Sequence, residues 1–339
     1  MVGGAMVEIL LFFLGASLIL YIVLGGADYG AGILELLPAG RLRDEQRSVI
    51  NKAMGPVWEA NHMWLILMVV ILFMGFPPVF LTLMVHLHIP MVALLVGIVL
   101  RGSAFTFRHY DAIQSEPSQT WYSRIFGFSS LWTAIWIGVI AGGLERGLID
   151  PQQRTFWGLY IAPWFGVFPL AVAAFTVAIF VFLAAVFLIG ESSNQDLKRR
   201  FATLGLIANV AVVVMGGVVF LVADQQGLPL LATFIASPGS LTAMVLATAL
   251  FFLVWRYAHS SRAIVVRLCA AAQIGLILVG WIIASSGEII RTAQGPINFY
   301  ASAAPEATLW QLTLALCVGS LLIFPSLIFL FRTFKGHLG

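Results

Sequence analysis

The sequence predicts an all-α polytopic membrane protein with nine transmembrane helices. Of its 339 residues, 60% are hydrophobic and only 10% are charged, whereas a soluble domain carries about 25% charged residues. Apolar runs of roughly 20 residues, the length that crosses the bilayer core, recur along the whole chain. Only short loops separate these runs. We therefore expect a single integral membrane domain over residues 1–339 and no soluble domain.

The nine apolar segments follow one another closely. The predicted spans cover residues 7–36, 57–75, 78–100, 122–144, 163–189, 201–223, 239–258, 263–285 and 307–332. The second and third spans are joined by GFPP, which predicts a tight antiparallel hairpin. Short connections favour antiparallel neighbours in a bundle. Basic loops after the first and the fifth span suggest two four-helix bundles plus one peripheral helix.

Basic residues are distributed unequally between the two sides of these spans. Of the 18 Lys and Arg residues, 15 fall on one side, and only Arg146, Arg154 and Arg291 fall on the other. Because cytoplasmic loops are enriched in Lys and Arg, this bias predicts an external N-terminus and a cytoplasmic C-terminus. The net charge of +3 then reflects loop placement, and nothing indicates nucleic-acid binding.

Two carboxylates lie in the inner parts of the first two spans. Asp28 belongs to the sequence GGADYGAG, where Gly26 and Gly30 form a small-residue face for close helix packing. Glu59 belongs to GPVWEANHMW, at the cytoplasmic entrance of the second span. An ionisable group inside a span costs about 2.5–3.5 kcal/mol on insertion scales, so a functional role is the default interpretation. The pair could take up protons from the cytoplasm. Alternatively, Asp28 bonds a neighbouring helix and Glu59 is a solvated first-turn residue favoured by the helix dipole.

The histidines near these carboxylates suggest two metal sites, and neither is well supported. Glu59 and His62 share a helix face and resemble half of a di-iron carboxylate site. Such a site needs a second Glu-x-x-His, which the chain lacks. His62 with His86 or His88 could ligate a b-type haem, as in a quinone-linked membrane anchor. Counting 1.5 Å per residue places His62 deeper toward the cytoplasm than the other two, so a shared haem is awkward.

A proton-coupled secondary transporter is the main alternative from another class. Asp28 and Glu59 would then be the coupling carboxylates. Transporters usually show broken helices near the membrane midplane in two related halves. Here the polar clusters lie toward one side and only in the first half of the chain, which disfavours a transporter.

The sequence around Asp28 fits a motif of subunit II of cytochrome bd-type quinol oxidases. That family shows Gly-Phe-Asp-x-Gly-x-Gly after its first span. Asp28, Gly30 and Gly32 match this motif, and Ala27 replaces the aromatic residue.

The second polar motif resembles the same family. The family pattern is His-Trp-Asp-x-Asn-x-x-Trp. Trp58, Asn61 and Trp64 match it, Glu59 stands at the aspartate position and Val57 replaces the histidine. The longer acidic side chain keeps the charge at this position.

The resemblance extends to Arg101 at the end of the third span and to Arg108 in a following aromatic–arginine pair. It implies nine spans and a pseudo-symmetric heterodimer with a haem-bearing subunit I. That partner would hold the haem b and haem d-type groups and the quinol-oxidation loop, and this chain would ligate no haem or metal. This chain would stabilise the haem region and lend Asp28 and Glu59 to the proton path.

The resemblance also implies the activity of the complex. It would oxidise quinol and reduce oxygen to water in an aerobic respiratory chain of a prokaryotic cytoplasmic membrane. Protons taken from the cytoplasm and released outside would generate proton-motive force. The chain alone would have no activity. Membrane lipid or a structural quinone, and a small single-span accessory subunit, are further partners compatible with the family.

Overall fold

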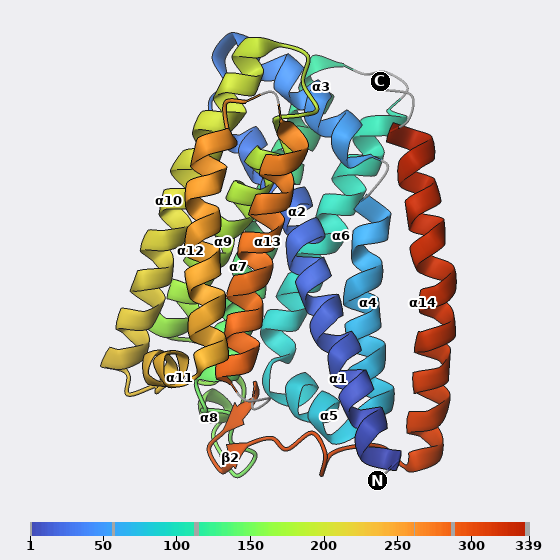
Figure 1. The fold of residues 1–339 in the computed structure, drawn as a ribbon, viewed down its shortest axis with the longest axis vertical. Helices are drawn as coiled ribbons and strands as arrows, with labels where there is room; N and C mark the ends of the chain where they lie inside the picture. Colours follow the sequence, from blue (N-terminus) through green and yellow to red (C-terminus); the bar gives the residue numbers. More distant parts are fainter. Residues whose placement is uncertain (1, 56–57, 112–114, 261, 286–288, 336–339) are drawn as a thin grey trace. The chain divides into compact units, whose positions relative to one another are not determined.

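The computed structural model describes residues 2–55, 58–111, 115–260, 262–285 and 289–335. Almost all of these residues are helical (Figure 1). Among them, eight helices are long and apolar enough to cross a membrane, or nine if a bent helix pair counts as one span. The predicted all-α polytopic fold is confirmed.

The described residues fall into two compact units. The first unit comprises those within 1–21, 56–83 and 298–339, and the second comprises those within 22–55 and 84–297. The chain passes from the first unit to the second inside its opening helix, at the π-helical turn η1 (Tyr21–Gly25).

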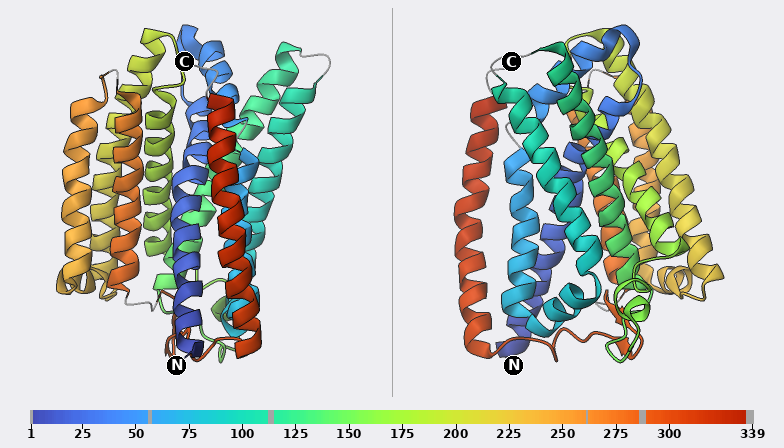
Figure 2. Two further views of the ribbon diagram at one scale, coloured as in Figure 1. Left: turned by 45° about the vertical axis from the view of Figure 1, so that its right-hand side comes forward. Right: turned by 180° about the vertical axis from the view of Figure 1, so that it is seen from behind.

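The first unit is built on three long helices that pack against one another, α1 (Val2–Leu20), α4 (Trp58–Gly75) and α14 (Glu306–Lys335) (Figure 2). Phe76 is fully buried where α4 ends, and its ring meets that of Phe299 edge to face at 5.1 Å. The Ala304 N–H donates to the Gly75 carbonyl at 2.8 Å. These contacts fill the break after α4 and satisfy one of its last carbonyl groups.

The predicted start of the third span is wrong. The sequence predicted a hairpin and one span over residues 78–100. The structure instead places a short helix, α5 (Pro77–His86), after α4 and bent from it by 117°. Two prolines open α5, at positions where a missing N–H loses no helical hydrogen bond. The helix therefore restarts in a new direction, and the third long helix begins only at His88.

The predicted end of this span is also wrong. The helix α6 (His88–Tyr110) continues to Tyr110 and carries Arg101 and Arg108 within it. The predicted span followed the apolar run and ended one residue before the first arginine. Both arginines are in fact buried, because acidic side chains of another helix pair with them.

The second unit contains the remaining long helices: α2 (Gly26–Leu36), α6, α7 (Glu116–Glu145), α9 (Val167–Leu188), α10 (Gln195–Gln225), α12 (Pro238–Tyr257) and α13 (Ala263–Ala284). The central helix is α9, which packs against α2, α7, α10 and α13 (Figure 1). Its residues Phe180, Phe182 and Leu183 are fully buried. An all-round hydrophobic helix is typical of such a central position.

Shorter elements occupy the connections between these helices. They are η2 (Gly40–Leu42), α3 (Arg43–Met54), α8 (Phe156–Tyr160), α11 (Leu230–Ala236), β1 (Arg291–Thr292) and β2 (Gly295–Pro296). The polar helix α3 has acidic residues in its first turn and Lys52 in its last, an order that suits the helix dipole. Gln46 holds α3 in place, because its Nε2 donates to the Leu34 carbonyl at 2.9 Å and its Oε1 accepts from Arg200 at 3.0 Å.

The close approach of α2 to α9 depends on glycine. A Cβ atom on Gly30 would overlap the carbonyl oxygen of Phe180 and lie 2.7 Å from the Ala184 Cβ. A Cβ on Gly26 would lie 2.6 Å from the Phe180 ring. Small residues let two helix backbones approach closely where hydrophobic exclusion between helices is weak. The small-residue face of the first span therefore packs on the central helix.

We expect Gly30→Ala to destabilise the protein by about 1–3 kcal/mol, the usual cost of overpacking. The obstacle is a backbone oxygen, so α2 and α9 must separate to admit the methyl group. Thermal unfolding in detergent, followed by circular dichroism, measures the effect.

Gly217→Ala is the matched control for Gly30→Ala. Gly217 also lies within a long helix, but a Cβ there meets nothing within 4 Å. This substitution should leave the unfolding temperature unchanged or raise it, because alanine favours helix by up to about 1 kcal/mol. Equal unfolding temperatures for the two variants would contradict the role of Gly30.

Candidate functional site

The most deeply buried charges of the second unit are Asp28 on α2 and Arg101 on α6. Each side chain is only 1% exposed, and Arg101 Nη2 donates to Asp28 Oδ1. Arg101 Nε donates to Ser130 Oγ on α7 at 3.1 Å. The guanidinium carbon lies 5.0 Å from the centre of the Tyr29 ring and 4.8 Å from that of Phe126. The arginine is thus held by a carboxylate, a hydroxyl and two aromatic faces.

A second buried pair, Glu35 with Arg108, repeats this arrangement. Arg108 Nη1 donates to both carboxylate oxygens of Glu35 at 3.0 Å, and the two side chains are 3% and 2% exposed. Arg108 also donates to Asn51 Oδ1 on α3 and, at 3.4 Å, to Ser123 Oγ on α7. Its guanidinium carbon lies 4.8 Å from the Phe126 ring centre. The Phe126 ring therefore contacts both arginines.

The two pairs are related by a common spacing of seven residues on three helices. We call the set the charge ladder; its members are Asp28, Glu35, Arg101, Arg108, Ser123 and Ser130. Seven residues are about two helical turns, so each helix presents its two members on one face. The residue numbers rise together on α2 and α6 and fall on α7. Hence α2 and α6 run parallel, and α7 runs antiparallel to both.

Gly32 allows α7 to approach α2 at the ladder. A Cβ atom at this position would overlap the Ser130 hydroxyl and lie 3.1 Å from the Phe126 ring. The third glycine of the first motif thus makes room for the serine that hydrogen-bonds to Arg101.

The charges within the ladder balance, with two carboxylates against two guanidinium groups. Breaking a buried pair by removing one partner usually costs about 3–5 kcal/mol, because an uncompensated charge is left in a medium of low dielectric. Asp28 Oδ2 and Arg108 Nε make no hydrogen bond within the described part of the chain. One carboxylate oxygen of the ladder is therefore available to a water molecule or a proton.

The second motif lies on α4, in the first unit. Asn61 and Trp64 are buried there and His62 is partly buried, and each of the three engages a partner. The side chains of Trp58 and Glu59 lie outside the described ones. The proton role of Glu59 therefore stays a prediction.

The two histidines near the start of α6 bond to backbone carbonyl groups. His86 Nδ1 lies 3.0 Å from the Leu159 oxygen and His88 Nδ1 lies 2.9 Å from the Val85 oxygen. Among the described residues, no group of three or more His, Cys, Asp or Glu side chains could hold a metal ion.

Sequence reasoning singled out Asp28, Arg101 and Arg108 but did not pair them. It did not single out Asn51 or Glu35. The available signal was the repeated spacing of seven residues, in D-x6-E of the first span and R-x6-R of the third.

The long apolar helices of the described residues define a multi-pass integral membrane protein, and its most deeply buried charges pair between helices. The model of the family described as cytochrome bd terminal oxidase subunit II matches residues 6–334. The chain belongs to this family.

Curated relatives and a solved structure agree with this assignment. The chain is 29% identical over 182 residues to cytochrome bd ubiquinol oxidase subunit 2 of Bacillus subtilis (strain 168), covering 53% of this chain and 52% of the relative. It is 26% identical over 202 residues to cytochrome bd-I ubiquinol oxidase subunit 2 of Escherichia coli (strain K12), covering 59% and 52%. The matched segments thus span about half the length of these relatives.

The fold is similar to that of a chain in the structure of bd oxidase from Geobacillus thermodenitrificans. The TM-score is 0.74 at 19% sequence identity, over 97% of this chain and 98% of that one. The similarity therefore extends through nearly the whole of both chains.

We expect Arg101→Gln to destabilise the protein by about 3–5 kcal/mol, because Asp28 would remain buried without a countercharge. Adding Asp28→Asn should recover part of this loss, since two neutral amides replace two charges. Unfolding of the two single variants and the double variant gives the coupling energy.

The exposed pair Arg41–Asp196 is the matched control for the buried pair. Its atoms are 3.7 Å apart, and its side chains are 87% and 59% exposed. Exposed pairs contribute about 0–1 kcal/mol, so Arg41→Gln should change little. A coupling energy for Asp28–Arg101 no larger than that of the control would refute the ladder as a stabilising element.

Proposed function

We propose that this chain is the second subunit of a bd-type quinol:oxygen oxidoreductase in a prokaryotic cytoplasmic membrane. The observation that carries the proposal is the family match over residues 6–334. The names of the curated relatives and the shared fold support it. In this proposal the chain forms a heterodimer with a haem-bearing subunit I, stabilises its haem region and has no activity alone.

The haem b and haem d-type groups belong to the partner subunit in this proposal, and quinol is the substrate of the complex. When bound there, the haems supply electron transfer and oxygen reduction. The residues of this chain would contribute by packing and by supplying protons. The charge ladder supports such a role, because it fixes three helices in one register around buried charges.

The orientation inferred from the basic residues sets the direction of proton uptake. When the buried Arg101 and Arg108 are left out, 15 − 2 leaves 13 basic residues on the inferred cytoplasmic side against three on the other. Glu59 and Asp28 would then each take up protons that come from the cytoplasm, Asp28 through its free oxygen Oδ2. Protease accessibility of a tag at Gly339 checks the orientation, since a tag cleaved only from outside would reverse it.

We expect the chain purified alone to show no haem absorbance. Co-expression with a nine-span subunit that carries haem-ligating histidines should yield a red heterodimer. The measurement is the reduced-minus-oxidised spectrum of each preparation, normalised to protein. A haem spectrum from the isolated chain would overturn the assignment of the haems to the partner.

Glu59→Gln should slow oxygen consumption by the complex while most of the haem stays in place. The amide keeps the size of the side chain but cannot give up and regain a proton. Glu116→Gln is the matched control, since Glu116 is an exposed carboxylate in the first turn of α7. Its turnover should equal that of the unmodified complex.

Asp28 requires a test that separates proton transfer from charge balance. If Asp28 serves only to neutralise Arg101, the double variant Asp28→Asn, Arg101→Gln should regain the turnover that Asp28→Asn loses. If Asp28 carries protons, the double variant should regain stability but remain slow. Full turnover in Glu59→Gln and in the double variant would remove both carboxylates from the proton path.

A further inference from the structure

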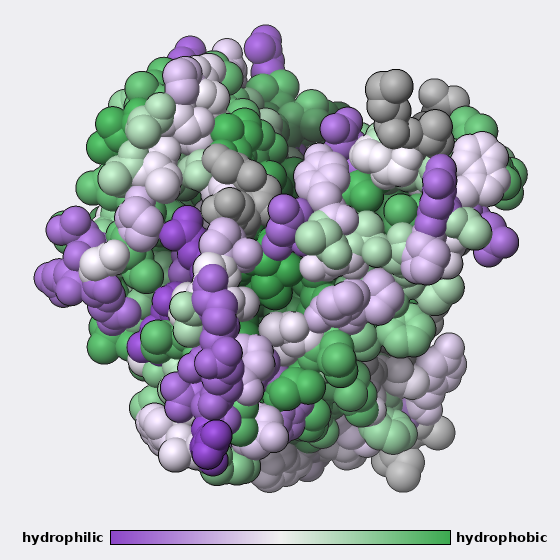
Figure 3. Space-filling model, turned by 90° about the horizontal axis from the view of Figure 1, so that it is seen from below, coloured by the Kyte–Doolittle hydropathy of each residue, from purple (hydrophilic) through white to green (hydrophobic). Residues whose placement is uncertain are grey.

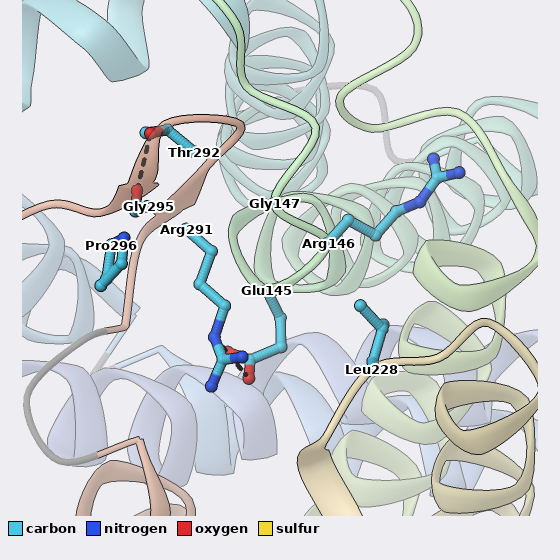
Figure 4. Close-up of a pocket in the computed structure, with 8 residues that line it drawn as sticks. All are labelled: Glu145, Arg146, Gly147, Leu228, Arg291, Thr292, Gly295 and Pro296. Atoms are coloured by element: carbon cyan, nitrogen blue, oxygen red, sulfur yellow. Dashed lines mark hydrogen bonds and ion pairs between the residues drawn. The ribbon is translucent and has the colours of Figure 1, made fainter.

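A pocket of about 260 Å³ lies in the second unit where α7 ends and the β1–β2 hairpin begins. Eight residues line it (Figure 4): Glu145, Arg146, Gly147, Leu228, Arg291, Thr292, Gly295 and Pro296. None of them belongs to the charge ladder or to the two sequence motifs. The pocket is several times larger than the roughly 30 Å³ that a water molecule occupies in the liquid.

Glu145 and Arg291 face each other in this pocket without forming a tight pair (Figure 4). The closest atoms, Glu145 Oε1 and Arg291 Nε, are 3.5 Å apart, whereas charge-assisted hydrogen bonds are usually about 2.7–2.9 Å. The carboxylate side chain is 5% exposed and the guanidinium side chain 21%. A buried carboxylate and a partly buried guanidinium thus retain unused hydrogen-bonding capacity.

Two atoms show this unused capacity. Glu145 Oε2 and Arg291 Nε make no hydrogen bond in the described part of the chain. One is an acceptor and the other a donor, so a ligand that carries both a positive donor and a negative acceptor would complete the site.

The other arginine of the pocket is engaged elsewhere. Arg146 Nη1 donates to the carbonyl oxygens of Ala162 and Phe165 at 3.0 and 2.8 Å, and its side chain points away from Glu145 (Figure 4). Among the described residues that line the pocket, the available charges are therefore one carboxylate and one guanidinium, which together are neutral. A simple anion bound to Arg291 would be repelled by the nearby carboxylate of Glu145. A divalent cation would find one carboxylate where calcium prefers six to eight oxygen ligands.

The wall that carries Arg291 is fixed before any ligand binds. Thr292 Oγ1 donates to the Gly295 carbonyl at 2.6 Å, which closes the hairpin. The Ala293 N–H donates to the Ile149 carbonyl at 2.9 Å, which ties the hairpin to the chain after α7. A preformed wall lowers the entropy that binding must overcome.

The pocket lies at the ends of candidate membrane spans, where a lipid headgroup would be expected. It adjoins the ends of two candidate membrane spans, α7 at Glu145 and α10 at Gln225. Leu148, Leu231 and Ile235, close in sequence to lining residues, are exposed. The view from the side of the hairpin shows hydrophilic side chains among hydrophobic areas (Figure 3). A headgroup in the pocket could thus continue into acyl chains on neighbouring apolar surface.

We propose that this pocket binds the headgroup of an aminophospholipid. The primary ammonium group donates to Glu145 Oε2, and the phosphate accepts from the Arg291 guanidinium. The two charges of such a headgroup equal those of the site in number, and each is opposite in sign to the side chain that it faces. The inference does not depend on the proposed oxidase function, because it uses only the pocket and its charges.

Native mass spectrometry tests the proposal on the purified full chain, with any subunit that copurifies. The probes are phosphatidylethanolamine, phosphatidylcholine and phosphatidylglycerol with identical acyl chains, each supplied in defined nanodiscs. Phosphatidylcholine keeps the phosphate and positive charge but has no N–H donor, and phosphatidylglycerol has no cation. We expect selective retention of phosphatidylethanolamine. The proposal would be overturned by equal retention of all three lipids or by retention of none. Displacement of phosphatidylethanolamine by a neutral hydroxyl compound would also overturn it.

Variants then locate the retained lipid. Glu145→Gln and Arg291→Gln should each weaken retention of phosphatidylethanolamine about tenfold, the scale of one lost charged hydrogen bond. Asp224→Asn is the control, because Asp224 is an exposed carboxylate at the end of α10 that does not line the pocket. Circular dichroism confirms folding of each variant. Unchanged retention in folded Glu145→Gln would place the lipid elsewhere and overturn the proposal.

Discussion

The pairing of two buried carboxylates with two buried arginines between candidate membrane spans is the constraint on which the second unit depends. Asp28 and Glu35 on α2 meet Arg101 and Arg108 on α6, and α7 supplies a serine to each arginine. Because an unpaired charge in this environment costs several kcal/mol, a shift of either helix by one residue would separate both pairs at once. Hydrophobic packing alone would tolerate such a shift more easily. The ladder therefore specifies register, while the glycines and α9 supply close packing.

The sequence predicted the fold class, the approximate spans and the residues that bear charge within them. Hydrophobic length is a local property, so it can be read without knowledge of neighbours. The predicted end of the third span was wrong for the same reason: it was inferred from local sequence alone. A local reading treats Arg101 as the point where a helix must leave the membrane, and only its pairing with Asp28 shows otherwise. The hairpin predicted at GFPP was wrong because two prolines can also begin a new helix, as they do in α5.

The candidate site was predictable in part. The motifs identified Asp28, Gly30, Gly32, Arg101 and Arg108 individually, and the structure adds the contacts between them. Pairing is a property of the tertiary arrangement, so no composition or periodicity shows that Arg108 meets Glu35 rather than water. The same limit applies more strongly to Glu145 and Arg291, which come from distant helix and hairpin segments. Their relation becomes visible only where both line one pocket.

The ladder also has a consequence for biosynthesis. In each pair the carboxylate precedes its arginine by 73 residues. At roughly 5–20 residues per second, Asp28 and Glu35 leave the ribosome about 4–15 s before the groups that neutralise them. During that interval the first helix holds two acidic side chains that disfavour a lipid environment. Stable integration of this helix is therefore coupled to the arrival of α6, and membrane insertion of the two helices should be completed jointly.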